Sequence, residues 1–388
     1  MPASRRPTAD AEPGPVPETS PEPVPGGARL ALPVLPPVDP MLARAVGAVP
    51  EPTSVEGGLW YEPKWDGFRC VVFYDGAAEG GPAVELGSRG GKPLTRYFPE
   101  VVAELVDQLG GARCVVDGEV VVRRGEPGAE RLDWEALSQR IHPAASRVRT
   151  LAEETPASFV AFDLLAEGDE DLTGRPAEER RRRLETAWAG VRGPLHVTQR
   201  TDDADLARRW LADFEGAGLD GVVAKPRAAR YEPGRRVMAK VKHARTADVV
   251  VVGYRVHKSG EGVGSLLLGL RPPGGEDFHQ VGGASAFTAA RRRELVDELA
   301  PHVERDADGE PLRGAGERNR FSASKDGSFV VVRPELVCEV GYDQLENGRF
   351  RHVVRFLRWR PDREPLSCTT DQIEVPAAYD LAAVLSGG

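Results

Sequence analysis

Apolar residues recur with two different periods along this chain, and the period changes near residue 246. Before that point, short apolar runs typical of strands alternate with segments whose apolar residues follow the helical period. Predicted helices cover residues 176–188 and 204–214, and predicted strands cover residues 71–74, 83–86, 114–116, 120–122, 158–165 and 221–224. The first helix has a proline in its first turn. It also carries four consecutive arginines, which we expect on its solvated face: Arg180, Arg181, Arg182 and Arg183.

Beyond residue 246 the pattern is mainly that of strands, broken by one helix at 288–299. The predicted strands are residues 248–256, 265–270, 278–281, 329–332, 336–342 and 353–359. Five or six strands and one helix in about 140 residues suit a small β-barrel of the OB type. Residues 1–30 are rich in Pro and Gly without apolar periodicity, so we expect a disordered tail there. We expect a second, weakly structured tail at 366–388, which leaves two domains, 31–245 and 246–365.

The composition is that of a soluble globular protein, with 40% hydrophobic and 29% charged residues. No apolar run approaches the roughly 20 residues that a membrane helix needs, and we expect no membrane association and no signal peptide. The cysteines show neither metal-ligand spacing nor the density of a disulfide framework. We therefore expect a cytoplasmic protein. The four cysteines are Cys70, Cys114, Cys338 and Cys368.

The net charge of −9 disfavours nucleic acid as a partner, but the basic residues are clustered. Residues 225–245 hold eight Lys or Arg against one acid, and residues 349–363 hold six Arg against one acid. Each cluster is either a phosphate-binding surface or a solvated basic face.

Lysine is rare in this chain, which makes the retained lysines candidates for amine chemistry. Only seven of the 51 basic residues are Lys. Arginine stays protonated and cannot act as an amine nucleophile. The most distinctive local sequence contains one of the seven, in the pattern K-x-D-G-x-R from Lys64 to Arg69. Taken alone, this pattern fits two interpretations equally well: a nucleophile on a tight loop, and a surface turn in a hairpin.

With the rest of the chain considered, the sequence resembles the covalent nucleotidyltransferases, which comprise ATP-dependent DNA ligases, RNA ligases and mRNA capping enzymes. Seven segments match motifs of that family in the family's order. The resemblance covers about residues 35–365 and looks closest to the short bacterial ligases called ligase C. The segments are Lys64 to Arg69, Ser88-Arg89-Gly90, Asp117-Gly118-Glu119, Phe162-Asp163, Asp220 to Lys225, Lys240-Val241-Lys242 and Arg360 to Arg363.

The resemblance implies an α+β fold, with an adenylation domain of the nucleotidyltransferase, ATP-grasp-like kind followed by an OB-fold barrel. It implies an ATP-dependent DNA ligase that seals 5′-phosphate/3′-hydroxyl nicks in repair, with ATP and Mg²⁺ or Mn²⁺ as cofactors. We expect a monomer that binds nicked double-stranded DNA. The implied catalytic residues are Lys64, Lys240 and Lys242, and the implied metal-binding residues are Glu119 and Asp220. The implied nucleotide-binding residues are Glu62, Lys64, Arg69, Arg89, Glu119, Phe162, Lys225, Lys240, Lys242, Arg360 and Arg363.

Two positions depart from the family pattern. Asp220 stands where the family often has Glu, so its reach toward a metal is shorter. Arg363 stands where the family often has Lys, and its guanidinium can still hold phosphate oxygens. Two of the motifs have alternative interpretations. Phe162 lies in an apolar strand and suits the core as well as a nucleotide site, and Glu119 with Asp117 suits a hairpin turn.

Three other functions fit parts of the pattern. An RNA ligase or a GTP-dependent capping enzyme would share the fold and the nucleophile. A non-catalytic OB-fold nucleic-acid-binding protein would not need to keep Lys64, Glu119, Lys240 and Lys242. An NAD-dependent ligase is disfavoured because the chain lacks a four-cysteine zinc module.

Overall fold

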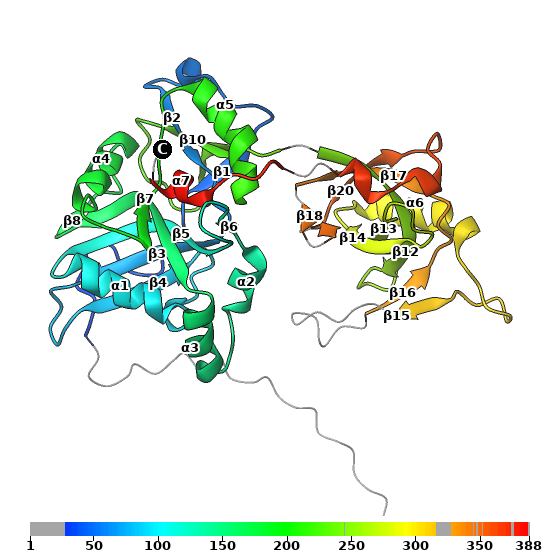
Figure 1. The fold of residues 1–388 in the computed structure, drawn as a ribbon, viewed down its shortest axis with the longest axis horizontal. Helices are drawn as coiled ribbons and strands as arrows, with labels where there is room; N and C mark the ends of the chain where they lie inside the picture. The colour runs from blue at the N-terminus through cyan, green and yellow to red at the C-terminus, as the bar shows by residue number, and fades with distance from the viewer. Residues whose placement is uncertain are drawn as a thin grey trace, which may run out of the picture.

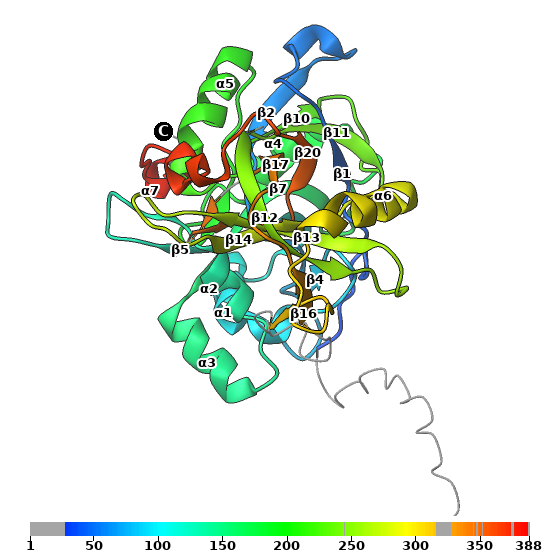
Figure 2. The same cartoon turned by 90° about the vertical axis from the view of Figure 1, so that its right-hand side faces the viewer.

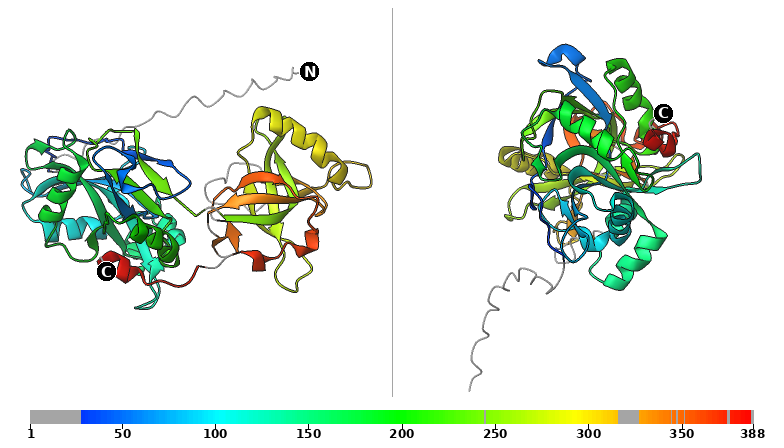
Figure 3. Two further views of the ribbon diagram at one scale, coloured as in Figure 1. Left: turned by 90° about the horizontal axis from the view of Figure 1, so that it is seen from above. Right: turned by 90° about the vertical axis from the view of Figure 1, so that its left-hand side faces the viewer.

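The computed structural model describes residues 28–243, 245–315, 327–343, 345–346, 348–350, 352–373 and 376–386. Figure 1 shows two lobes, the first built from the N-terminal two thirds of the chain and the second from most of the remainder. Figure 3 shows the same separation from above. In the part of the chain that is described, every helix is too short or too polar to span a lipid bilayer. The predicted disordered tail falls almost wholly outside the described residues.

The first lobe is built on a seven-stranded sheet with the order β4-β3-β5-β7-β8, in which β6 pairs with β5 and β9 pairs with β7. All these pairs are antiparallel except β7 with β9. The strands are β3 (Phe68–Asp75), β4 (Ala83–Ser88), β5 (Arg113–Arg124), β6 (Arg131–Leu132), β7 (Ala157–Glu167), β8 (Glu170–Asp171) and β9 (Leu195–Val197).

A smaller, four-stranded sheet with the order β1-β11-β10-β2 lies against this large sheet. Its strands are β1 (Leu42–Ala45), β2 (Leu59–Pro63), β10 (Val222–Pro226) and β11 (Arg236–Val241). Of these four strands, only β10 corresponds to a predicted strand, at residues 221–224. The four strands are short and mix charged with apolar residues, so their apolar periodicity is weak.

Helices cover the face of the large sheet that the small sheet leaves free. Side chains of α1, α2 and α4 pack there against alternate residues of β3 and β5. α5 packs instead on the small sheet. The helices of this lobe are α1 (Pro99–Leu109), α2 (Trp134–Gln139), α3 (Ala145–Glu154), α4 (Ala177–Ala187) and α5 (Ala204–Asp213), with 3-10 turns η1 (Pro52–Ser54), η2 (Thr95–Tyr97) and η3 (Phe214–Ala217). The two predicted helices are confirmed as α4 and α5.

Two apolar clusters join the two sheets, and they leave a polar zone between them. On β5, Val115 belongs to one cluster and Val121 to the other. Because side chains alternate along a strand, Asp117 and Glu119 project on the same face between them. The hairpin-turn interpretation of these two acids is therefore wrong, since the predicted strands 114–116 and 120–122 form one continuous strand.

The second lobe is a strongly curled sheet with the order β14-β13-β12-β16-β15, and β17 pairs with both β12 and β20. Its buried side chains form one core with α6, which lies alongside the barrel strands in Figure 2. This is the predicted OB-type barrel. Its elements are β12 (Arg245–Val256), β13 (Val263–Leu270), β14 (His279–Ala284), α6 (Ala289–Leu299), η4 (Ala300–His302), β15 (Arg313–Ala315), β16 (Ser328–Val331), β17 (Val337–Tyr342), β18 (Leu345–Glu346), β19 (Arg349–Phe350) and β20 (Arg355–Trp359).

The C-terminal segment is more ordered than the weakly structured tail that we expected. It forms η5 (Pro365–Ser367), η6 (Thr370–Gln372) and α7 (Leu381–Ser386). Ile373 is buried in the barrel core, whereas Leu381 and Val384 are buried against α5 in the first lobe. Figure 1 places α7 (red) in the first lobe, away from the barrel. The three buried residues pack into two different lobes, so the segment has no single apolar period that would reveal this packing from sequence.

Candidate active site

A pocket opens between the large and small sheets of the first lobe. Strands of both sheets contribute to it, so residues far apart in the sequence meet there. Its lining includes eight predicted site residues: Glu62, Lys64, Arg69, Arg89, Glu119, Phe162, Lys225 and Lys240. The other lining residues are Pro40, Met41, Leu42, Ala43, Pro63, Trp65, Val223, Arg236 and Met238.

Lys64 lies directly after β2, on a loop whose backbone is fixed. Its amide donates to the carbonyl of Gly221 at 2.9 Å, and its carbonyl accepts from the amide of Asp220 at 3.0 Å. Gly67, three residues later, is needed because a Cβ there would lie 2.1 Å from the carbonyl oxygen of Val120. The glycine therefore allows the loop to approach β5 closely. The surface-turn interpretation is wrong, since Lys64 lies in a pocket.

One carboxylate of this site contacts two of the three predicted catalytic lysines. Oδ2 of Asp220 lies 2.5 Å from Nζ of Lys64 and 2.8 Å from Nζ of Lys242. Burial alone would raise the pKa of Asp220, but the two ammonium groups lower it below its ordinary value. The pKa of Lys242 is raised because Asp220 outweighs the effect of burial.

Lys240 completes the lysine cluster from β11. Burial lowers its pKa, and the positive charges of Lys64 and Lys242 lower it further. The site therefore concentrates cationic charge where a polyanion would be stabilised.

Arg69 lies on β3 and is held by a buried carboxylate. Its Nε and Nη2 each donate to Asp117 at 2.5 Å, and Asp117 also accepts from the hydroxyl of Tyr231 at 2.7 Å. The guanidinium carbon lies 4.4 Å from the centre of the Phe162 ring. The guanidinium of Arg69 is thus hydrogen-bonded to Asp117, although the side chain still lines the pocket.

Phe162 lies at the pocket, not only in the core. Its ring is 9% exposed and has Nζ of Lys225 4.7 Å from its centre, besides Arg69. Cations over a ring face are favourable contacts. The ring therefore presents an apolar surface inside a strongly cationic site.

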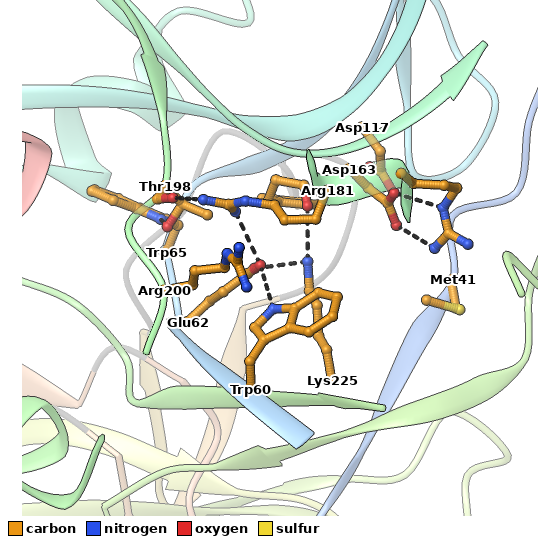
Figure 4. A network of polar contacts seen from close by, with 12 residues as sticks. Met41, Trp60, Glu62, Trp65, Asp117, Asp163, Arg181, Thr198, Arg200 and Lys225 are labelled. Carbon is orange, nitrogen blue, oxygen red and sulfur yellow. Dashed lines mark hydrogen bonds and ion pairs between the residues drawn. The ribbon is translucent and has the colours of Figure 1, made fainter. Parts of the chain in front are cut away.

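Glu62, at the end of β2, is fixed by donors from three elements (Figure 4). Its Oε1 accepts from Nε1 of Trp60 at 2.9 Å and from Nη1 of Arg181 at 3.1 Å, and its Oε2 lies 2.7 Å from Nζ of Lys225. Lys225 also donates to the carbonyl of Phe162 at 3.1 Å. Both charged partners of Glu62 are buried.

Glu119 accepts from the amide of Gly67 at 3.1 Å. Burial raises its pKa to about 7, although Arg69 and Lys64 act in the opposite direction. Among the residues that the structure describes, no group of three or more His, Cys, Asp or Glu is arranged to hold a metal ion. A metal here would have to draw most of its ligands from a bound phosphate and from water, which is how Mg²⁺ is usually held.

The two predicted arginines of the barrel do not line the pocket. Nη1 of Arg360 donates to Asp248 at 3.0 Å and Nη2 to Asp362 at 2.9 Å, both within the second lobe. Nε of Arg363 lies 3.5 Å from Asp248. Lys242, whose Nζ lies 2.8 Å from Oδ2 of Asp343 beyond β17, connects the two lobes instead.

Two of the four consecutive arginines of α4 are buried, although we expected all four on a solvated face. Arg180 is fully buried and Arg181 is 3% exposed, so the predicted solvated face is wrong for both. A signal was available, since Ala177, Leu184 and Trp188 mark the inner stripe of the helix. Positions 180 and 181 fall on that stripe at spacings of three and four. Arg182, by contrast, is exposed.

Comparison with known proteins points to one family. A family profile described as "ATP dependent DNA ligase domain" matches residues 40–242, and one described as "ATP dependent DNA ligase C terminal region" matches residues 259–363. DNA ligase C1 of Mycolicibacterium smegmatis is 53% identical over 362 residues, covering 92% of this chain and 99% of that protein. DNA ligase C of Mycobacterium tuberculosis is 50% identical over 373 residues, again covering 92% and 99%. The solved structure named "Pmar-Lig_Pre." shares the fold with a TM-score of 0.53 at 16% identity, covering 83% of this chain and 68% of that one.

Proposed function

This chain belongs to the ATP-dependent DNA ligase family, and we propose that it seals nicks between a 5′-phosphate and a 3′-hydroxyl through an AMP bound covalently to Lys64. The observation that carries the proposal is the meeting of Lys64 with Glu62, Glu119, Phe162 and Lys240 around one pocket. Attack on the α-phosphorus of ATP requires an amine nucleophile, a cluster of cations to stabilise the phosphates and an apolar ring surface for the base.

In the first step, the neutral amine of Lys64 attacks the α-phosphorus of ATP. A P–N bond forms, the bond to the bridging oxygen breaks, and pyrophosphate leaves. Lys64 must first lose its proton and separate from Asp220, from which its Nζ now lies 2.5 Å. Lys240 and Lys242 stabilise the charge on the α-phosphate.

The adenosine of ATP would be held by residues around Glu62. Glu62 accepts and Lys225 donates, so the pair offers complementary partners to the 6-amino group and N1 of adenine. Phe162 offers its ring for stacking on the base. Glu119 would bind the ribose hydroxyls, because a carboxylate can accept hydrogen bonds from them.

Mg²⁺ or Mn²⁺ fits the donor set that these residues supply. Glu119 and Asp220 offer carboxylate oxygens beside the lysine cluster, and the remaining ligands would come from phosphate and water. When bound, the metal would neutralise part of the charge on ATP, which carries about four negative charges.

After adenylylation, AMP passes from Lys64 to the 5′-phosphate at the nick, and the 3′-hydroxyl then displaces AMP as the phosphodiester forms. Arg69 and Arg89 hold the 5′-phosphate in this scheme. Arg360 and Arg363 orient the departing pyrophosphate in the first step, which requires the barrel lobe to move toward the pocket.

Labelling with radioactive ATP and GTP in separate reactions tests the first step. We expect ATP alone to label the protein at Lys64, whereas labelling by GTP would favour a capping-type enzyme. A sealing assay on nicked duplexes with DNA or RNA on each side of the nick tests the rest. Joining confined to RNA strands would favour an RNA ligase, and binding without joining would favour a non-catalytic protein.

We also propose that the protein works in DNA repair, in the cytoplasm and as a monomer. Its four cysteines are all described, buried and free, which suits a reducing compartment. Light scattering on the purified chain would test the monomer, since a dimer would double the 41.9 kDa mass.

A further inference from the structure

A charged side chain is buried behind the pocket without lining it. Arg181 projects inward from α4, and its side chain is 4% exposed. Its Nη1 donates to Glu62 at 3.1 Å and its Nε to Glu185 at 2.8 Å, while Nη2 donates to the carbonyl of Thr198. Burying an ion pair is seldom a net source of stability, because desolvation offsets the attraction. The cost of this arrangement suggests a role beyond holding α4 in place.

Arg181 restrains the orientation of the Glu62 carboxylate. The carboxylate of Glu62 has about four acceptor sites, and three donors already occupy it from β2, α4 and β10. The terminal torsion of a glutamate is otherwise broad, so an unrestrained carboxylate would sample many orientations. Figure 4 shows Trp60 and Arg181 both directed at the same oxygen of Glu62.

We propose that Arg181 is a positioning residue that sets the selectivity of this enzyme for the purine base by fixing the carboxylate of Glu62. With Oε1 held by Trp60 and Arg181, and Oε2 held by Lys225, one orientation of the carboxylate remains to meet a base in the pocket. Pre-organised polar groups cost nothing to orient when the ligand binds. This inference rests on the proposed function, since it takes a purine nucleotide as the ligand.

Arginine is suited to this task and lysine is not. The guanidinium is a planar fork with five donors, so it can hold Glu62, Glu185 and the Thr198 carbonyl at once. A lysine ammonium would retain the charge, but it is a point donor that cannot keep all three contacts in one plane.

The test compares Arg181→Met and Arg181→Lys with Arg182→Met, which removes the exposed neighbour on the same helix. The rate of nucleotidyl transfer to Lys64 is measured with ATP, which transfers AMP, and with inosine triphosphate, which has a carbonyl at position 6 and transfers IMP. We expect Arg181→Met to raise KM for ATP about tenfold, to change kcat less than twofold and to reduce the preference for ATP over inosine triphosphate. Arg181→Lys should restore part of the preference, and Arg182→Met should match the wild type.

A double-mutant cycle with Glu62→Ala separates positioning from simple destabilisation. If Arg181 acts through Glu62, Arg181→Met should add no further change in KM or base preference to Glu62→Ala. Additive effects would overturn the proposal, and so would an unchanged base preference in Arg181→Met. If Arg181→Met does not fold, the same two criteria apply to Arg181→Lys. Failure of the wild-type chain to take up AMP from ATP would instead overturn the proposed function.

Discussion

Asp220 links Lys64 to a second lysine of the site. Its Oδ2 lies 2.5 Å from Nζ of Lys64 and 2.8 Å from Nζ of Lys242. In the proposed scheme Lys64 must separate from this carboxylate before it attacks phosphorus. Lys242 is already in place to keep the ion pair with Asp220 when Lys64 leaves it.

Replacing Lys64 tests the nucleophile directly. Lys64→Ala should abolish labelling by ATP and all joining, because the amine is lost. Lys64→Arg should fail equally, since a guanidinium stays protonated. Labelling is measured with radioactive ATP, followed by base treatment that a phosphoramidate survives. Lys258→Ala, which removes an exposed lysine of the barrel lobe, is the control and should label normally. Base-stable AMP on either Lys64 variant would show that another residue is the nucleophile.

We expect Phe162 to determine how tightly ATP is held, without taking part in the phosphate chemistry. Phe162→Ala removes the ring that lines the pocket and should weaken ATP binding by about 1–3 kcal/mol, a rise in KM of roughly fivefold to 150-fold. Joining of a nick that already carries AMP should change much less, since that base is delivered with the DNA. An unchanged ATP dependence would mean that the ring stabilises the core and does not stack on the base.

Among the secondary-structure elements, the apolar periodicity of the sequence predicted the long and strongly apolar strands and helices. The strand at residues 158–165 and the helices at 176–188 and 204–214 are present as β7, α4 and α5. A strand that is buried on both faces has a continuous run of apolar residues, and a helix that is buried on one face has an apolar stripe. Both patterns can be recognised in the sequence. The order of the motifs predicted which residues would meet, and eight of the predicted site residues line one pocket.

What escaped prediction depends on contacts between distant segments. Arg180 is buried because Asp163, on the neighbouring β7, accepts two hydrogen bonds from it at 2.8 Å. No local pattern around residue 180 contains that partner. The pairing of the small sheet depends on such contacts too, since its parallel β1–β11 pair joins residues almost 200 positions apart in sequence.

Strand β9 carries a partly buried histidine, His196, whose Nε2 is enclosed, and it should make the first lobe sensitive to acid. Burial lowers the pKa of His196 to about 4, with a smaller contribution from Arg123, and its Nε2 has no hydrogen-bond partner among the described residues. The unfolded chain takes up the proton near pH 6.5, before the folded chain does. This contribution to stability is therefore intact above pH 6.5 and is lost as the pH falls toward 4, by up to about 3 kcal/mol.

His196→Gln should remove that loss. We expect the free energy of unfolding to fall less steeply between pH 6.5 and 4 in the variant than in the wild type. Urea titrations followed by tryptophan fluorescence report on the first lobe, since Trp359 is the only tryptophan beyond it. The exposed His279 on β14 provides a control, and His279→Gln should keep the wild-type slope. Equal slopes in all three proteins would place the acid sensitivity elsewhere.

At the scale of the whole molecule, the chain crosses between the lobes twice. The first crossing follows Val241, and the second follows Ile373 in the barrel core and ends at α7 on α5. The return is fixed by several contacts, because Leu381 donates its amide to Glu130, Gln199 donates to the carbonyl of Val384 and the ring of Tyr379 packs on Phe214. Two crossings restrict how the barrel can turn relative to the pocket.

Val384→Asp should release this second crossing. Val384 is 1% exposed, so the change removes its burial and would place a carboxylate in an apolar site. The loss should exceed the roughly 1.5–3 kcal/mol of a buried valine, and α7 should detach before the lobe unfolds. Limited proteolysis near residue 380 should accelerate at least tenfold, whereas the exposed Ser386→Asp should behave as the wild type. If cleavage is no faster in Val384→Asp, α7 does not hold the segment to the first lobe.

In the proposed scheme, Arg360 connects the position of the barrel lobe to one step of the reaction. It is now paired with Asp248 and Asp362 inside that lobe and does not line the pocket. It can contact the departing pyrophosphate only if the lobe moves toward the pocket, and it has no such substrate once Lys64 carries AMP. Arg360→Ala should therefore take up AMP at least tenfold more slowly, yet join a pre-adenylylated nick at near the wild-type rate.

Both rates are measured in single-turnover reactions with purified full-length protein, with Arg358→Ala as the control. Arg358 lies on the same strand, is exposed and pairs with Glu339, so its loss removes the same charge from the barrel without touching the pair with Asp248. We expect this variant to retain both rates. Loss of joining at the pre-adenylylated nick, as severe as the loss of adenylylation, would contradict the scheme. Arg360 would then act on DNA or in the final step, and the barrel lobe would not need to move toward the pocket for ATP.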